Sequence, residues 1–93
     1  MDDRIEAFLR DVLRAKGRPN SDIRETVRIA LADCEQNFRK HEMDNFRRDE
    51  ATRRCRDLCR DRVIEEIKGR EGTSTAEHLK LVLSMIDQAV KDE

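Results

Sequence analysis

Residues 21–68 read SDIRETVRIALADCEQNFRKHEMDNFRRDEATRRCRDLCRDRVIEEIK, a stretch that contains neither proline nor glycine. A continuous α-helix over this stretch would be about 70 Å long at roughly 1.5 Å per residue. A compact domain of this size is only about 26 Å across, taken as twice its expected radius of gyration. The stretch therefore either breaks near its middle or needs a partner molecule to cover it.

The apolar pattern within the stretch changes direction halfway. Its first half carries a stripe with helical spacing, which fades beyond His41. At about 100° per residue, Ala51, Cys55 and Leu58 then fall on nearly the opposite side of the helix. The stripe on the original face consists of Ile23, Val27, Ala30, Leu31, Cys34 and Phe38, followed later by Cys59, Val63 and Ile67.

Two architectures account for this pattern. A bend near 43–46, with Asp44 or Asn45 as a new N-cap, gives a monomeric up-down bundle of four helices. A continuous central helix instead carries two apolar faces, and its displaced patch of Ala51, Cys55 and Leu58 meets a second subunit in an antiparallel homodimer. We favour the continuous helix and the homodimer because aspartate and asparagine cost only tenths of a kcal/mol within a helix.

Shorter helices flank this central segment. Residues 3–16 have apolar side chains at spacings of three and four, and Gly17 and Pro19 end that helix. The second helix begins at Asn20 or Ser21, either of which can cap its free amides. The connection 69–73 contains two glycines, and a capping box from Ser74 to Glu77 then opens a last helix that reaches about Lys91. The sequence predicts one all-α domain over residues 1–93.

Composition narrows the classes of function. Charged residues make up 44% of the chain and aromatic residues 3%, but the net charge is only −1. Nucleic acid is therefore an unfavoured partner, and no apolar stretch approaches the roughly 20 residues that cross a membrane. An odd number of cysteines fits a reducing compartment, so we expect a cytoplasmic protein. The excess of arginine over lysine suggests a bacterial source.

The cysteines are the first candidate site. Cys55 and Cys59 lie one turn apart, and in an antiparallel pair of long helices Cys34 of one subunit would approach them from the other. Three thiolates, or two with His41, would suit Zn²⁺ or Cu⁺, and neighbouring arginines would raise thiol reactivity. Cysteine is also a small apolar residue that fills helix-facing positions, and we expect this packing role and no cofactor.

The arginine-rich face between residues 47 and 62 is the second candidate. Acidic residues are interleaved with its arginines, which favours a solvated helix face held by pairs four residues apart. Binding of nucleic acid through this face is the alternative. The face comprises Arg47, Arg48, Arg53, Arg54, Arg56, Arg60 and Arg62.

The sequence offers no pattern typical of an enzyme. The histidines His41 and His78 are isolated, and we expect both at the surface or at its boundary. No nucleophile elbow or phosphate-binding loop is present. We therefore expect a non-enzymatic interaction or regulatory module that acts as a homodimer with an unidentified protein partner. The alternatives are a thiol- or metal-responsive sensor using the cysteines, and a nucleic-acid-binding protein.

Overall fold

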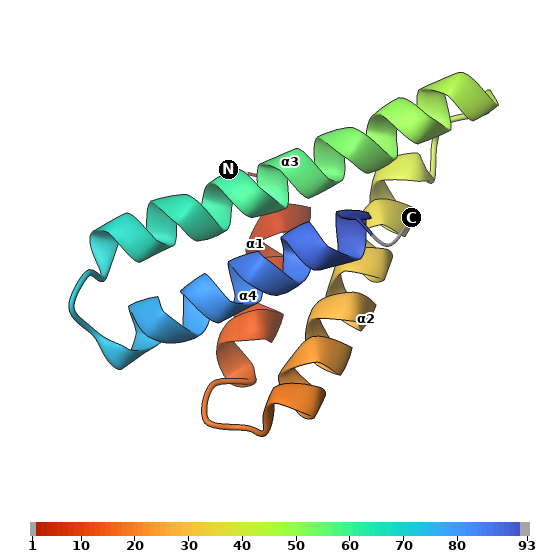
Figure 1. Cartoon of the computed structure of the whole chain (residues 1–93). Helices are drawn as coiled ribbons and strands as arrows, with labels where there is room; N and C mark the ends of the chain where they lie inside the picture. Colours follow the sequence, from red (N-terminus) through yellow and green to blue (C-terminus); the bar gives the residue numbers. More distant parts are fainter. Residues whose placement is uncertain (1, 92–93) are drawn as a thin grey trace.

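The computed structural model of this protein describes residues 2–91, which form four α-helices and no strand (Figure 1). The all-α prediction is confirmed. Each helix packs against the other three, so the described residues form one helical bundle. The helices are α1 (Asp3–Arg14), α2 (Asn20–Arg39), α3 (Asn45–Gly69) and α4 (Ser74–Lys91).

The predicted continuous central helix is wrong, because the chain turns between α2 and α3. Asp44 has an extended backbone, and its carboxylate accepts hydrogen bonds from the amides of Phe46 (2.8 Å) and Arg47 (3.3 Å). It is therefore the N-cap of α3, as the alternative with a bend proposed. The longest dimension of the bundle is 43 Å, well short of the length of one continuous helix.

The shift in the apolar pattern reflects this turn. After it, α3 runs back along α2, and the inward face of α3 begins a new helical phase at Ala51 and Cys55. The displaced patch is thus covered largely by the same chain. Burial of the apolar stripes of α2 and α3 against each other contributes more to stability than the small differences in helix propensity for which the continuous helix was favoured.

The helix ends agree with the sequence in part. Gly17 (φ +87°) and Gly72 (φ +81°) adopt the left-handed conformation in the two connections where glycine was expected to end a helix. The cap of α4 lies one residue earlier than predicted, since the Thr73 hydroxyl accepts from the amide of Ala76. Pro19 occupies the N-cap position of α2 without a side-chain hydrogen bond, so neither Asn20 nor Ser21 is its cap.

One core runs through the bundle and includes all three cysteines together with the stripes of the four helices. His78 is also buried, and its Nε2 lies 2.8 Å from the carbonyl oxygen of Val12, so the prediction that it lies at the surface or at its boundary is wrong. This contact joins α4 to the end of α1. No helix within residues 2–91 combines the length and hydropathy needed to cross a membrane.

Candidate metal centre

The three cysteines converge where α3 folds back along α2. Cys34 faces inward from the last third of α2, and Cys55 and Cys59 face inward from consecutive turns of α3. Their Sγ atoms all lie within 4.8 Å of one another, and the Sγ atoms of Cys34 and Cys59 are 3.8 Å apart. The predicted meeting of these residues therefore occurs within one chain rather than between two subunits.

The cluster is closed to solvent. The exposed fraction is 3% for Cys34 and 0% for both Cys55 and Cys59, and all three are free thiols. A packing role accounts for burial of each small side chain. It does not require the three sulfur atoms to meet at one point, and that convergence is what makes the cluster a candidate site.

Hydrogen bonds between the thiols make them unequal. The thiol of Cys59 donates to Cys34, and in its neutral form Cys34 donates to the carbonyl oxygen of Arg4 at 3.8 Å. Hydrogen bonds from Cys55 and Cys59, with a smaller contribution from the charge of Arg4, lower the pKa of Cys34 from 9.0 to about 4. Hydrogen bonding to Cys34 is the main factor that raises the pKa of both Cys55 and Cys59. The cluster therefore favours a single negative charge, centred on Cys34.

The sulfur positions are close to those that a bound ion needs. Thiolates about 2.3 Å from a tetrahedral ion lie about 3.8 Å from one another, which matches the distance between Cys34 and Cys59. Each remaining pair needs to move by no more than about 1 Å, since Zn–S bonds near 2.3 Å set this spacing. Three sulfur donors select thiophilic ions over hard ones such as Mg²⁺ and Ca²⁺.

His41 is not part of this centre. It is exposed in the turn between α2 and α3, and the only such group of potential ligands within residues 2–91 consists of the three cysteines. The predicted alternative of two thiolates with His41 therefore does not fit the arrangement.

Two arginines of the arginine-rich face are half-buried, and the others are exposed. Arg56 bonds to Glu35 of α2 at 2.8 Å. Arg62 bonds to Glu6 of α1 at 2.8 Å and to Glu66 of its own helix at 3.0 Å. These two arginines join α3 to its neighbours and are committed to carboxylates within the bundle.

The other arginines of this face are exposed. Arg53 pairs with Glu50 at 3.5 Å, and Arg60 pairs with Asp87 of α4 at 3.0 Å. Carboxylates thus neutralise part of the face, which therefore lacks the concentrated positive charge that favours contact with phosphates. Binding of nucleic acid through this face stays a prediction. The remaining exposed members, on the first half of α3, are Arg47, Arg48 and Arg54.

The residues predicted to form a dimer interface lie at different depths. Cys55 is fully buried within its own chain, whereas Ala51 and Leu58 are half-buried and pack against the core. Both line a surface hollow of about 380 Å³ beside Arg4 and Phe38. Cys55 is therefore not available to a second subunit, and a dimer through the other two residues stays a prediction.

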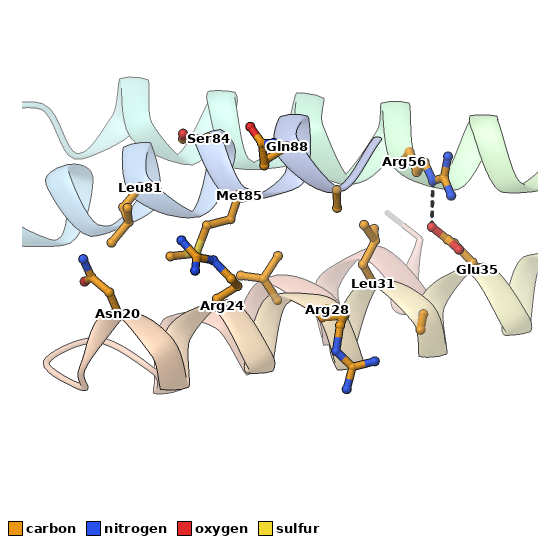
Figure 2. A pocket seen from close by; sticks show the side chains of 13 residues that line it. Asn20, Arg24, Arg28, Leu31, Glu35, Arg56, Leu81, Ser84, Met85 and Gln88 are labelled. Atoms are coloured by element: carbon orange, nitrogen blue, oxygen red, sulfur yellow. Dashed lines mark hydrogen bonds and ion pairs between the residues drawn. The ribbon is translucent and has the colours of Figure 1, made fainter. Parts of the chain in front are cut away.

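A groove between α2 and α4 was not anticipated from the sequence (Figure 2). It has a volume of about 760 Å³, and its lining includes the apolar side chains of Leu31, Leu81 and Met85. Figure 2 shows Arg24 reaching into the groove, which ends near the ion pair between Arg56 and Glu35. The sequence does carry a signal for this surface, because Leu81 and Met85 widen the apolar stripe of the last helix.

Comparison of the chain with protein-family models, with curated proteins and with solved structures gives no match. The function is therefore argued from the chemistry of the cysteine cluster and its surroundings.

Proposed function

We propose that this protein binds a thiophilic metal ion through Cys34, Cys55 and Cys59 and acts as a metal- or thiol-responsive protein. The observation that carries the proposal is the convergence of the three Sγ atoms to within 4.8 Å in the interior of the bundle. Sulfur ligands favour ions such as Cu⁺ and Zn²⁺. A buried position also protects bound thiolates from exchange with other ligands.

Binding at this place would change the stability of the bundle. Cys34 belongs to α2 and the other two ligands to α3, so an ion bound to all three holds these helices together. A ligand that binds only the folded state stabilises it by about 2.7 kcal/mol at a free concentration of 100 times its Kd. This difference in stability between the ion-free and the ion-bound bundle is the physical basis on which the protein would respond to the ion.

Thermal unfolding of the reduced full-length chain tests this function. With Cu⁺ or Zn²⁺ at about 100 times Kd we expect the midpoint to rise by about 10 °C or more. The variant Cys59→Ser should lose this rise because one ligand is missing. His41→Ala is the matched control and should retain it, since His41 lies outside the cluster.

The possible outcomes separate the ligand sets. Loss of the rise in His41→Ala would show that the exposed histidine, and not the buried trio, holds the ion. If neither Cu⁺ nor Zn²⁺ nor any other thiophilic ion shifts the unfolding of the wild-type chain, the proposed function is wrong. Unfolding curves in a chelator provide the ion-free reference for every variant.

A protein-interaction role as a homodimer is the second candidate. Two large apolar side chains are strongly exposed near the turn between α2 and α3, with exposed fractions of 93% for Met43 and 71% for Phe46. Met43 precedes α3 by two residues and Phe46 lies in its first turn, and exposed apolar patches are typical of contact surfaces. The mass in solution, measured over a range of concentrations for the wild type and for Leu58→Asp and Phe46→Ser, tests it. A wild type that stays monomeric throughout would eliminate the homodimer.

A further inference from the structure

The charge of the cysteine centre discriminates between the ions that three thiolates can hold. Three sulfur ligands bring three negative charges into a region whose side chains are at most 3% exposed. Arg4 is a cation whose charge acts on Cys34, but its guanidinium is already bound to the carboxylate of Asp2 at 2.8 Å. Compensation must therefore come mainly from the ion itself.

The candidate ions leave different net charges in the core. With three thiolates, Cu⁺ leaves a charge of minus two, Zn²⁺ leaves minus one, and a trivalent ion leaves none. An uncompensated charge in a protein interior is strongly unfavourable even after relaxation of its surroundings. The enclosed position of Cys34, Cys55 and Cys59 therefore disfavours Cu⁺. Zn²⁺ leaves the same single negative charge that the cluster carries without an ion, and a trivalent ion removes it.

Coordination number decides between Zn²⁺ and a trivalent ion. Within residues 2–91 the cluster contains three potential ligands, all sulfur. Structural zinc sites are almost always four-coordinate, so Zn²⁺ would lack a protein ligand here. Trivalent arsenic binds three sulfur atoms in a pyramid, and its lone pair occupies the remaining direction without needing a partner. An apolar core suits that lone pair.

We propose that the cysteine centre binds trivalent arsenic, taken up as arsenous acid, with one bond to each of the three sulfur atoms. This inference rests on the proposed function and identifies its ligand. Arsenous acid is small and uncharged at neutral pH, which suits passage into a closed core. Cys34 is ionised in the ion-free cluster, so the thiol protons of Cys55 and Cys59 and one proton from solvent combine with the three hydroxyl groups of arsenic, which leave as water. Two S–H and three As–O bonds break, three As–S and three O–H bonds form, and no electrons are transferred.

Native mass spectrometry of the full-length chain, reduced with a phosphine and incubated with sodium arsenite, tests the proposal. The expected adduct adds one arsenic atom and removes three hydrogen atoms, the signature of three As–S bonds. Binding through two sulfurs would retain a hydroxyl group, and the adduct would then add one arsenic and one oxygen and remove one hydrogen. The two adducts differ by one water molecule and are resolved by mass.

Variants assign the bonds to residues. Cys59→Ser should give only the two-sulfur adduct and should also weaken binding. Loss of a residue that only hydrogen-bonds to a metal ligand weakens binding roughly 10–100-fold, and loss of a ligand itself should weaken it more. His41→Ala should give the same adduct as the wild type. Circular dichroism verifies that each variant is helical, and the wild-type mass decides the proposal even if a cysteine variant does not fold.

The negative outcomes are distinguishable. A wild-type adduct that retains oxygen, or no arsenic adduct in a chain that binds Cu⁺ or Zn²⁺, would overturn the assignment to arsenic and leave the proposed function standing. A wild-type chain that binds none of these ions would overturn both.

Discussion

The guanidinium carbon of Arg4 lies 3.8 Å from the centre of the Phe38 ring, directly beside the cysteine cluster. The carbonyl oxygen of Arg4 is 3.8 Å from the Sγ of Cys34, and Phe38 follows Cys34 by one turn of α2. The hollow beyond this stacked pair is lined by Arg4, Phe38 and Leu58 among others. Arg4 and Phe38 thus line the hollow and lie close to Cys34, and we expect small reagents that approach Cys34 from the hollow to displace them.

Replacement of Arg4 by alanine should therefore speed alkylation of Cys34 in the folded protein. A cation–π contact at an exposed position contributes about 0.5–1 kcal/mol, so we expect a rate about two to five times higher. Electrostatics alone predicts the opposite, because loss of the positive charge disfavours the reactive thiolate. Labelling with iodoacetamide, followed by mass spectrometry, measures the rate.

Arg60→Ala is the matched control for this experiment. Arg60 is exposed to a similar degree and also pairs with an aspartate, but it lies between α3 and α4. Its removal should leave the rate unchanged. Labelling of Arg4→Ala at or below the wild-type rate, with global stability verified by urea unfolding, would contradict the expected increase and show that the charge of Arg4 affects the rate more than its cover does.

The pKa shifts of the cysteines predict how stability depends on pH. In the folded state the pKa values of Cys55 and Cys59 are raised above 9.0, so both thiols stay protonated where the unfolded chain ionises them. Above pH 9 the unfolded state binds fewer protons, and stability must fall as pH rises. The lowered pKa of Cys34 has the opposite sign. Its contribution is fully present above pH 9 and is lost as pH falls toward about 4.

Urea unfolding at about pH 8 and about pH 10 measures the alkaline part of this dependence. Between pH 8 and pH 10 each of the two protonated thiols should lower the stability by about 1.4 kcal/mol in total, whereas ionised Cys34 should raise it by about the same amount. The double variant Cys55→Ala, Cys59→Ala lacks all three contributions, because it also removes the hydrogen-bond donors of Cys34, so the wild type should lose about 1–2 kcal/mol more than this variant. The comparison uses the change with pH in each protein, because the double variant is less stable at every pH. Equal changes in both proteins would mean that these thiols ionise freely in the fold.

The sequence predicts the outer helices well and the centre poorly. The stripes of α1 and α4 repeat without interruption, and glycines mark both connections. The break before Asp44 was the less favoured alternative because an aspartate that caps a helix and one that lies within it differ by only about 1 kcal/mol. The shift of the apolar face at Ala51 was the better signal, and we assigned it to a second subunit instead of to a new helix.

The preference for a continuous helix also affected the prediction of the cysteine site. Cys34, Cys55 and Cys59 were recognised as possible partners from their helix faces, but a straight helix could bring them together only between two chains. Once α3 folds back along α2, one chain is enough. The contact between Arg4 and Phe38 joins residues 34 positions apart by sequence number. No local pattern indicates such a contact.

The cap of α3 gives a direct test of the break. Asp44→Ala removes the acceptor of two amide hydrogen bonds, at 2.8 and 3.3 Å, and should lower the free energy of unfolding by about 1 kcal/mol. Asp49→Ala removes an exposed aspartate from the same helix and should change it by less than about 0.5 kcal/mol. Urea unfolding of both variants provides the values. Equal small effects would indicate that α2 and α3 are continuous in solution.

Arg62 and Arg60 provide a contrast between half-buried and exposed ion pairs on one helix. Arg62 is 17% exposed and bonds to Glu6 of α1 and to Glu66, whereas Arg60 is 46% exposed and pairs with Asp87. Hydrogen bonds to charged groups contribute about 1.5–3 kcal/mol when they are shielded from water, but exposed pairs contribute at most about 1 kcal/mol. Arg62→Ala should therefore destabilise the bundle more than Arg60→Ala does.

A double-mutant cycle with Glu6→Gln isolates the bond between α1 and α3. Glu66 keeps Arg70 as a partner at 2.8 Å when Arg62 is removed, so the loss falls mainly on Glu6. We expect a coupling energy of about 1 kcal/mol from urea unfolding of the two single variants and the double variant. A coupling near zero would show that packing of the apolar stripes alone holds α1 against α3, and that the ion pair forms without stabilising this contact.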